Sequence, residues 1–233
     1  MPSSLMHIYL IEAGPRLLAG MSEESSAHAE QFLREMGVNI LLNKRVVDYR
    51  DHKVVLEDGT EIATRTFIWV SGVTGVTIGN LDASLIGRGG RIKVDSFNRV
   101  EGMNNVFAIG DQCIQLADEN YPNGHPQLAQ VAIQQGELLA KNLIRMEKGQ
   151  EMKPFHYRNL GSMATVGRNR AVAEFSKVKM QGWFAWVMWL VVHLRSILGV
   201  RNKVIVLLNW VWNYFTYDQS MRMIVYARKA KEI

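Results

Sequence analysis

The first half of the chain alternates apolar and polar segments in the order strand, helix and strand. Residues 7–12 form a short apolar run that ends in Glu12, and a glycine and a proline stop the strand soon afterwards. Ser22 opens an amphipathic helix that stops at Gly37. Residues 38–42 are apolar again. Short connections between such elements predict a doubly wound α/β sheet.

The spacing of apolar positions changes after residue 42. Residues 46–63 hold three short apolar segments separated by polar turns, which predicts a small antiparallel meander. Residues 66–70 and 105–109 have the apolar composition of buried strands. A long helix is predicted from Pro126 to about Met146, because the missing N–H of proline costs nothing in the first helical turn.

Tryptophan and other apolar residues gather near the C-terminal end. Residues 155–175 again predict strands, and ten consecutive apolar residues follow at 183–192. Five of the six tryptophans lie between positions 183 and 212. Neither this run nor the run at 204–208 reaches the roughly 18–20 residues that a membrane-spanning helix needs. Short, tryptophan-rich segments with flanking arginines favour helices that lie in a membrane interface, and a buried helical pair in a soluble core is the alternative.

The net charge of +5 is unevenly divided along the chain. Residues 151–233 contain thirteen Lys and Arg against four Asp and Glu, whereas residues 1–150 contain fourteen against eighteen. The basic excess therefore belongs to the C-terminal third, which indicates an anionic partner such as a membrane surface or a nucleic acid. Its basic residues interleave with long apolar runs instead of forming a solvated stripe, so we expect a membrane and no nucleic acid.

Composition excludes several other classes of protein. With 233 residues, of which 48% are hydrophobic and 21% charged, the chain is long enough for one large or two small globular domains. Cys113 is the only cysteine, which excludes a disulfide framework, a cysteine-based zinc site and Cys-x-x-Cys redox chemistry. No metal site is predicted. We expect both Cys113 and His125 to be structural.

Three strand ends carry residues suited to binding a nucleotide. Glu12 could accept hydrogen bonds from both hydroxyls of an adenosine ribose, and a solvated acid at a strand end is the alternative. Gly72 and Val73 follow a predicted strand, where glycine lets a flat ring approach the backbone, and a plain turn is the alternative. Gly110 and Asp111 end another strand at the sheet edge where ligands bind. Asp111 could hydrogen-bond a polyol, and an aspartate that only serves the turn is the alternative.

The predicted long helix carries two amides on one face. Gln130 and Gln134 are four residues apart, so they share a helix face and could bracket the carbonyl group of a ligand. The positive end of the helix dipole would stabilise an anionic reduced flavin. A polar stripe on a packed helix has the same spacing, so the spacing alone leaves both interpretations open.

The order of five segments resembles one family of flavoproteins. LIEAGPRLL is similar to the second strand of an NADH-binding domain, FIWVSGV to the element beside the nicotinamide, and NNVFAIGD to the second flavin motif. LAQVAIQQG resembles the quinone-site signature Ala-Gln-x-Ala-x-Gln, and FHYRNLGSMATVGRNRAV resembles the start of a C-terminal domain. The whole resembles the two-dinucleotide-binding-domain flavoproteins and, within them, the type II NADH dehydrogenases, which are non-proton-pumping NADH:quinone oxidoreductases.

The resemblance implies a role for each motif residue. The residues that it assigns to NADH are Glu12, Gly72 and Val73. The residues that it assigns to FAD are Gly110, Asp111, Leu128, Ala129 and Gln130. The residues that it assigns to the quinone are Gln130 and Gln134. FAD and NAD would supply the redox chemistry, so no side-chain nucleophile is required and no catalytic residue is named.

The resemblance also implies the fold and its division. We expect an α/β chain made of remnants of two Rossmann-like dinucleotide-binding domains, followed by a C-terminal domain with amphipathic membrane-anchoring helices. The expected boundaries are residues 1–75 for the NADH-binding part, 76–150 for the FAD-binding part and 151–233 for the membrane-association domain. The family's N-terminal flavin domain, with its Gly-x-Gly-x-x-Gly turn, has no counterpart in this sequence, so we expect the chain alone to be inactive and colourless.

The function that the resemblance implies is electron transfer from NADH through FAD to a membrane quinone, as part of a longer flavoenzyme. We expect peripheral, monotopic attachment to the cytoplasmic face of the inner or plasma membrane through the region from Trp183 to Phe215, and a homodimer is an allowed assembly. Glu12 favours NADH, because a carboxylate would repel a 2′-phosphate. The alternatives are a soluble NAD(P)H-dependent flavin reductase with a protein acceptor and a truncated, non-enzymatic membrane-associated module.

Overall fold

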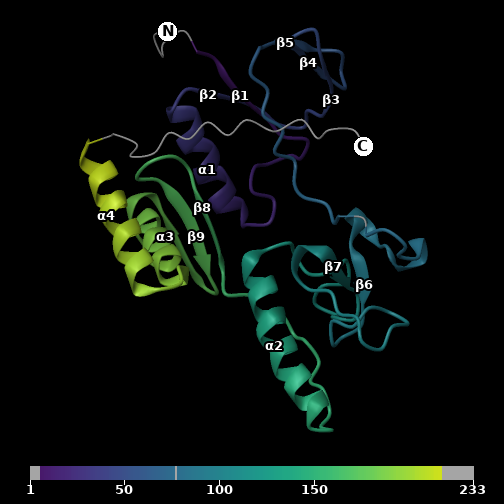
Figure 1. Ribbon diagram of the computed structural model, residues 1–233. Coiled ribbons are helices and arrows are strands. Elements are labelled where there is room, and N and C mark those ends of the chain that lie inside the picture. The colour runs from purple at the N-terminus through teal and green to yellow at the C-terminus, as the bar shows by residue number, and fades with distance from the viewer. Residues whose placement is uncertain (1–5, 77, 217–233) are drawn as a thin grey trace, which may run out of the picture. The chain divides into compact units, whose positions relative to one another are not determined.

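The computed structural model describes residues 6–76 and 78–216 and divides the chain into two compact units (Figure 1). The first unit combines Met1–Ala63 with Gly161–Ile233, and the second is Thr64–Leu160. Each unit has its own strands and helices, so each is described by itself. The division at residues 75 and 150 that the sequence suggests stays a prediction.

The first unit begins with the strand, helix and strand that the apolar pattern predicts. β1 (Ile8–Ile11) and β2 (Val38–Leu41) pair in parallel, and α1 (Glu23–Glu35) connects them. The Ser22 hydroxyl accepts a hydrogen bond from the backbone N–H of Ser25 and caps the helix. Gly37 follows with a φ of 82°, a left-handed conformation that ends helices at little cost for glycine. The parallel α/β unit is therefore confirmed.

The predicted meander is also present in the first unit. β3 (Val46–Arg50), β4 (Lys53–Leu56) and β5 (Glu61–Ala63) form an antiparallel sheet in the order β3-β4-β5. Val54 and Leu56 of the central strand are buried, while most outer positions are exposed. This two-sided pattern is typical of antiparallel strands that bury one face.

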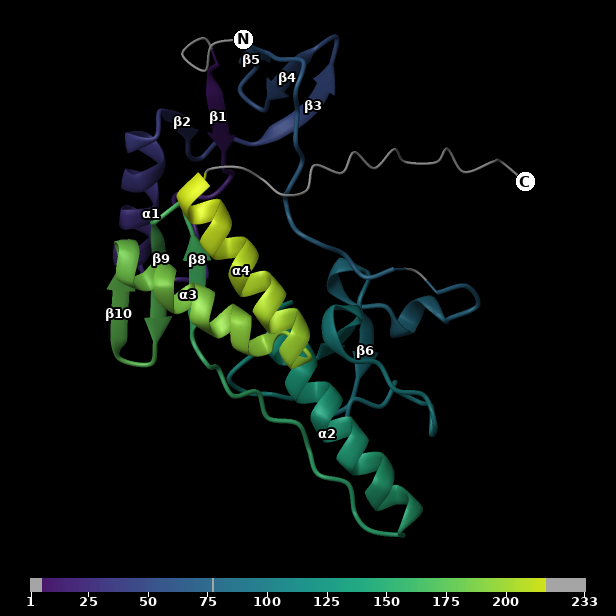
Figure 2. The same ribbon diagram turned by 60° about the vertical axis from the view of Figure 1, so that its left-hand side comes forward.

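A third sheet and two helices complete the first unit. β8 (Ser162–Thr165), β9 (Ala171–Phe175) and β10 (Val178–Gln181) are antiparallel in the order β10-β9-β8. α3 (Gly182–Ser196) packs on this sheet and α4 (Val200–Thr216) packs on α3, as Figures 1 and 2 show. The fully buried Ala171, Ala173 and Ala185 form the contact, because small side chains let helix and strand approach closely.

The sheet of β8, β9 and β10 is bound to both ends of α1. The Glu174 carboxylate accepts a hydrogen bond from the Ser22 N–H at 3.0 Å and another from the Ser22 hydroxyl, at the start of the helix. Arg170 forms an ion pair of 2.8 Å with Glu35 at the other end, and its guanidinium lies 5.4 Å from the Phe32 ring. The segments before residue 63 and after residue 161 therefore share one core.

The second unit is built around a short parallel pair and one long helix. β6 (Ile92–Val94) pairs with β7 (Cys113–Gln115), and α2 (Ala129–Glu147) is the long helix. Three 3₁₀ turns, η2 (Ala83–Leu85), η3 (Arg88–Gly90) and η4 (Gly110–Gln112), connect these elements. The buried core consists of Ile92, Val94, Val100, Ala108 and Cys113.

Two predicted strands of the second unit differ from the structure. Residues 66–70 are not paired as a strand in the described part of the chain, and Ile68, Trp69 and Val70 are 74%, 60% and 83% exposed. The expected strand at 105–109 is reduced to one bridge, between Phe107 and Arg99. An apolar run indicates that a segment is suited to burial, but a strand also requires a neighbouring strand to pair with.

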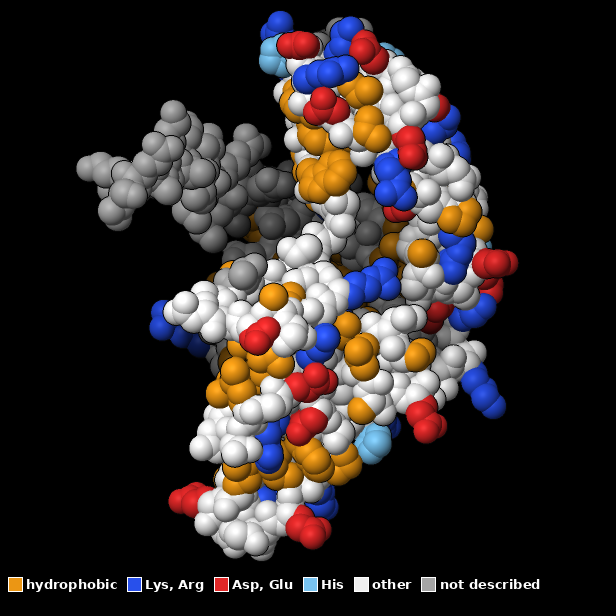
Figure 3. Space-filling view, turned by 90° about the vertical axis from the view of Figure 1, so that its right-hand side faces the viewer, with side chains coloured by type: hydrophobic (Ala, Val, Ile, Leu, Met, Phe, Trp, Pro, Cys, Tyr) orange, Lys and Arg blue, Asp and Glu red, His pale blue; other side chains and the backbone are white. Residues whose placement is uncertain are grey.

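Apolar side chains reach the surface between charged ones on the face drawn in Figure 3.

The long helix starts later than the sequence suggests. α2 begins at Ala129, because Leu128 is extended with a φ of −131° and acts as the N-cap. The N–H of Leu128 instead donates to the carbonyl of Pro126 in a tight turn. Proline therefore sits in the turn that leads into the helix, two residues before its cap.

Candidate functional site

Glu12 lies at the carboxyl end of β1, as the sequence predicts. Its backbone N–H continues the ladder by donating to the Leu41 carbonyl at 2.9 Å, and its carbonyl accepts from the Lys44 N–H. The carboxylate Oε1 accepts from the Gly14 N–H at 2.7 Å, which fixes the side chain over the turn. Among the described contacts Oε1 alone is engaged, so Oε2 is available to accept from a hydroxyl group.

Gly72 and Val73 lie in an extended segment of the second unit. Gly72 has a φ of 101°, which favours glycine, and a Cβ there would have no heavy atom within 4 Å. Val73 is exposed. The backbone here is accessible from solvent, so a planar ring could approach it.

Gln112 ties this segment to the Gly110–Asp111 turn. The Gln112 side chain accepts from the Val76 N–H at 2.8 Å and donates to the Val76 carbonyl at 2.7 Å. Gly75 also donates to the Gly89 carbonyl at 2.8 Å. These bonds hold Val76, three positions after Val73, beside Gln112, the residue that follows Asp111. Nothing in the sequence pattern around Gln112 indicated this role.

Gly110 and Asp111 form the 3₁₀ turn η4 beside α2. Gly110 has a φ of 66°, and a Cβ there would lie 3.2 Å from the Cβ of Ala132, so glycine allows the turn to approach the helix. The exposed Asp111 keeps its carboxylate on the surface, while its backbone carbonyl accepts from the Gln127 amide at 3.1 Å. This turn offers a carboxylate acceptor next to the first turn of a long helix.

Gln135 is a buried residue that sequence reasoning did not single out. Its Oε1 accepts from the Gly110 N–H at 2.7 Å and lies 3.7 Å from the Cys113 sulfur. It shares the buried face of α2 with Val131 and Asn142, positions four earlier and seven later. That helical spacing was the available signal, because it places the third glutamine of the run towards the core.

Gln130 and Gln134 share one face of α2, as predicted, and that face binds another segment. The Gln134 amide donates to the Arg158 carbonyl at 2.9 Å and accepts from the Arg158 N–H at 3.0 Å. Gln130 accepts from the Leu160 N–H at 3.0 Å. Residues 155–160, here called the strap, therefore run along the amide face of α2. The two amides bracket backbone carbonyl and N–H groups.

A buried histidine fixes the loop that leads into α2. The Nε2 atom of His125 lies 3.0 Å from the Oδ2 of Asp118, and the imidazole packs against Tyr121, Phe155 and Tyr157 at 5.1–5.8 Å between ring centroids. The buried Arg91 donates to the His125 carbonyl at 3.1 Å. The hydrogen bond from His125 holds the pKa of Asp118 below its usual value. These contacts fasten both the loop and the strap.

Cys113 lies in the core of the second unit beside this loop. Burial raises the pKa of its thiol, so the sulfur stays protonated and is no nucleophile. No group of three or more His, Cys, Asp or Glu residues in the described ranges could hold a metal ion.

The α3–α4 pair of the first unit is joined by aromatic contacts and is apolar on its outside. Trp186 lies 5.7 Å from Tyr214 and Trp189 lies 6.3 Å from Trp210, measured between ring centroids. Arg168 adds a cation–π contact of 4.9 Å to Tyr214. No helix within residues 6–76 and 78–216 combines the length and apolar character that crossing a bilayer requires.

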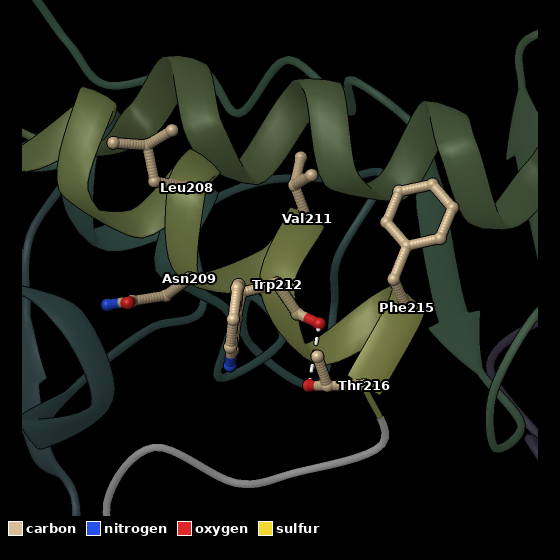
Figure 4. A pocket seen from close by; sticks show the side chains of 6 residues that line it. All are labelled: Leu208, Asn209, Val211, Trp212, Phe215 and Thr216. Carbon is tan, nitrogen blue, oxygen red and sulfur yellow. Dashed lines mark hydrogen bonds between the residues drawn. The ribbon is translucent and has the colours of Figure 1, made fainter.

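The C-terminal half of α4 presents a mainly apolar pocket (Figure 4). Its lining comes from one face of the helix, and the Thr216 hydroxyl donates back to the Trp212 carbonyl at 2.9 Å, while the Asn209 amide is a further polar group of the lining. The lining residues are Leu208, Asn209, Val211, Trp212, Phe215 and Thr216.

Comparison with protein families gives two matches in sequence order. Residues 3–136 match the family described as pyridine nucleotide-disulphide oxidoreductase, and residues 159–217 match the NDH2 C-terminal domain. The chain is 35% identical to the type II NADH:quinone oxidoreductase NdhA of Mycobacterium tuberculosis, over 95% of this chain and 49% of that protein. It is 32% identical to the internal alternative NAD(P)H-ubiquinone oxidoreductase A1 of Arabidopsis thaliana, over 90% of this chain and 44% of that protein.

Solved structures share the fold at lower identity. The structure of NDH2 from Plasmodium falciparum in complex with NADH has a TM-score of 0.80 and 18% identity, over 91% of this chain and 58% of that one. A sulfide:quinone oxidoreductase from Aquifex aeolicus reaches a TM-score of 0.64 at 16% identity, over 90% of this chain and 54% of that one. The chain thus spans about half the length of the curated relatives that it matches.

Proposed function

The chain belongs to the pyridine nucleotide-disulphide oxidoreductase family, and from that membership we propose that it forms part of a type II NADH:quinone oxidoreductase. The observation that carries the proposal is that a match to this family and a match to the NDH2 C-terminal domain occur in one chain. Over 95% of its own residues, this chain is 35% identical to such an enzyme. The proposed activity is electron transfer from NADH through FAD to a membrane quinone.

The residues around Glu12 fit the adenosine ribose of NADH. A carboxylate at the carboxyl end of a parallel strand is the group that accepts hydrogen bonds from ribose hydroxyls in such folds. Gly14 holds Oε1 at 2.7 Å, so the carboxylate is oriented before any ligand arrives. The same negative charge would repel the 2′-phosphate of NADPH, which supports NADH as the substrate. Gly72 and Val73 are proposed to lie beside the nicotinamide.

The turn at Gly110 and Asp111 fits the ribitol end of FAD. Asp111 is exposed and carries acceptor oxygens, and Gly110 leaves no side chain between the turn and α2. Leu128, Ala129 and Gln130 at the start of α2 are proposed to face the flavin ring. When bound, FAD supplies hydride acceptance from NADH and electron donation to the quinone. Within this proposal the chain is assigned the ribose, ribitol and ring contacts.

The quinone is proposed to bind beside Gln130 and Gln134. Their amides already hold the peptide groups of Arg158 and Leu160, so the strap forms one wall of the proposed pocket. In this arrangement Gln134 acts mainly by holding the wall, and Gln130 lies nearer the start of α2. Both residues would then influence the quinone step without taking part in hydride transfer.

Membrane contact is proposed for the outer face of α3 and α4. Exposed aromatic and aliphatic side chains cover both helices between Trp183 and Phe215, while the aromatic rings of the inner face hold the pair together. Short helices of this composition lie in the interface plane. We propose peripheral, monotopic attachment on the cytoplasmic face of the membrane, with a homodimer as an allowed assembly.

The test of this proposal compares two electron acceptors in the FAD-loaded enzyme. Gln134→Ala should lower the rate with a membrane quinone more than the rate with a water-soluble dye, because only the quinone needs the strap. The exposed Gln150 supplies a control, since Gln150→Ala should change neither rate. Equal losses with both acceptors would contradict the quinone assignment. A quinone rate that is no faster in vesicles than in detergent would favour a soluble reductase instead.

A further inference from the structure

All the formal charges of the α3–α4 hairpin lie at its turn. Between residues 182 and 216 the chain has no Asp or Glu, and its only Lys or Arg residues are Arg195, Arg201 and Lys203. Residues 195–203, here called the hairpin tip, comprise the end of α3, the connection at 197–199 and the first turn of α4. Charged residues that only keep a helix surface soluble would be spread along both helices. The concentration of all three cations at one end therefore indicates a specific role.

The exposed apolar stripe of α3 ends in the first of these cations. Phe184, Met188 and Val191 are exposed, and they are followed at helical spacing by the exposed Arg195. These four positions lie on one side of the helix, since residues three or four apart are neighbours on its surface. Ala185, one residue after Phe184, is buried against β9 and marks the side that faces the sheet.

The exposed stripe of α4 begins with the second cation. Arg201 is followed at spacings of four, three, four and three by the exposed Ile205, Leu208, Trp212 and Phe215. Each helix therefore carries one apolar stripe, and both stripes reach an arginine at the same end of the hairpin. Lys203 lies two residues further on, on the side of α4 that carries Trp210 and faces α3.

The centre of the hairpin tip is apolar and strongly exposed. Leu198 is 87% and Val200 is 79% exposed, and they stand between Arg195 and Arg201. None of the three cations forms an ion pair with a residue in the described ranges. Arg201 and Lys203 also lie in the first turn of α4, where positive charge opposes the helix dipole. Arg195, in the last turn of α3, complements a helix dipole, so helix stability accounts for Arg195 but not for Arg201 and Lys203.

We infer that the hairpin tip is a binding surface for acidic phospholipid headgroups, and this inference rests on the membrane contact proposed above. Leu198 and Val200 would enter the outer acyl region, while the three cations lie at headgroup level on both sides. Long basic side chains next to apolar residues are suited to this depth, because their stems are apolar and their charges stay in water. The tip would therefore give the protein a preference for anionic membranes over neutral ones.

The size of this preference follows from the number of cations. Each Lys or Arg near an anionic bilayer contributes about a five-fold gain in partitioning, so three should give roughly a 100-fold preference at moderate ionic strength. The gain should shrink as salt is added, because exposed charges are screened over about 10 Å at 0.1 M.

The experiment measures co-sedimentation of the full chain with two kinds of vesicle, one of phosphatidylcholine and one of phosphatidylcholine mixed with phosphatidylglycerol. The test variant is Arg195→Gln/Arg201→Gln/Lys203→Gln. Its matched control, Arg45→Gln/Arg50→Gln/Lys177→Gln, also removes two arginines and one lysine, from exposed positions elsewhere in the same unit. Circular dichroism spectra of all three proteins establish that the helices are kept.

The inference predicts a wild-type preference for the mixed vesicles, lost in the tip variant and kept in the control. The tip variant should bind neutral vesicles as the wild type does. Equal loss in both variants would overturn the inference, because net charge and not the tip would then explain the preference. A wild type without preference would also overturn it. Binding to neither vesicle would instead contradict the proposed membrane contact itself. Displacement by duplex DNA at the tip would assign the cations to a nucleic acid and overturn the lipid inference.

Discussion

Gln134 and Arg158 are joined by two hydrogen bonds, in which a side-chain amide pairs with a peptide group as a neighbouring strand would. The Gln134 nitrogen donates to the Arg158 carbonyl at 2.9 Å, and its oxygen accepts from the Arg158 N–H at 3.0 Å. Twenty-four positions separate these residues, so the pairing connects the middle of α2 to the strap. The strap thus depends on amide chemistry at one helix position.

The first prediction concerns the protection of the strap from hydrogen exchange. Gln134→Ala should speed exchange of the Arg158 amide, because its acceptor is removed, at a cost of about 1 kcal/mol in local stability. Gln134→Glu keeps the acceptor oxygen and should leave this amide slow. The Leu160 amide, which donates to Gln130, is the internal control and should change little. Unchanged exchange at Arg158 in the alanine variant would contradict the pairing.

A second prediction separates backbone strain from packing at Gly110. Gly110 and Gly149 both have a φ of 66°, but a Cβ at Gly110 meets Ala132 at 3.2 Å, whereas a Cβ at Gly149 has no heavy atom within 4 Å. Each alanine variant should lose roughly 1–2 kcal/mol from the left-handed backbone conformation. Gly110→Ala should lose more in urea unfolding, since it also pushes η4 away from α2. Equal losses would show that the contact with Ala132 is unimportant.

A third prediction concerns Gln135, the buried partner of the Gly110 N–H. Gln135→Leu keeps much of the volume but leaves that N–H without its acceptor, which should cost about 1–3 kcal/mol. Gln135→Glu retains an acceptor oxygen and should be less damaging below the pKa of the new carboxyl, because ionising this buried group carries a desolvation cost. Gln150→Leu on the exposed surface is the control. Thermal unfolding of the three variants measures the difference, and a neutral Gln135→Leu would refute the assigned role.

The fourth prediction is a pH dependence that belongs to Asp118. The hydrogen bond from His125 lowers the Asp118 pKa in the folded chain, so the unfolded state binds this proton more readily. The resulting stability is present above the ordinary aspartate pKa of about 4 and is lost as the pH falls through the lower, folded value. Urea midpoints between neutral and acid pH should therefore fall more steeply in the wild type than in Asp118→Asn.

The control for this pH effect is the exposed neighbour Glu119. Glu119→Gln removes a carboxylate from the same loop without touching the His125 pair. Its midpoints should follow the wild type across the acid range. If Asp118→Asn and Glu119→Gln flatten the profile equally, the effect belongs to the charge of the loop and not to the buried pair.

A fifth prediction measures how the C-terminal sheet stabilises α1. Ser22→Ala removes the cap and should cost about 1 kcal/mol. In a double-mutant cycle with Glu174→Gln, the two losses should not add, because the Glu174 carboxylate acts through the Ser22 hydroxyl and N–H. The exposed pair Lys179 and Glu24 joins the same elements and should show no measurable coupling. Additive losses at Ser22 and Glu174 would exclude direct coupling.

Local pattern was sufficient for the elements whose signals are short-range. The Ser22 cap, the Gly37 stop and the parallel strands on either side of α1 were all predicted, because capping and periodicity act within a few residues. The prediction of a strand at residues 66–70 was wrong, because pairing of a strand depends on segments that are distant in sequence. Apolar composition indicates that Ile68 and Val70 need cover, but it does not indicate which segment supplies it, and no strand in the described ranges pairs with them.

The candidate site divides in the same way. Gln130 and Gln134 could be placed on one helix face by counting residues. Their backbone partners lie 30 and 24 positions away, respectively, and the spacing within the helix does not reveal them. Gln112 and Gln135 were missed, although Gln135 bonds the predicted motif residue Gly110 and Gln112 bonds Val76, three positions after Val73. A glutamine in a sequence does not reveal whether its side chain is buried, because the amide forms hydrogen bonds both with water at the surface and with backbone groups in the core.

The hydrogen bonds from Ser22 to Glu174 stabilise α1, and they also fix the orientation of α1 relative to the sheet that carries α3. α3 rests on β9, β9 holds Ser22 through Glu174, and the chain before Ser22 leads back through one loop to Glu12. Within this unit, contacts therefore connect α3 through β9 and α1 to the turn at Glu12. If α3 lies on a surface, its orientation there therefore also fixes the direction in which the Glu12 carboxylate of the same unit points.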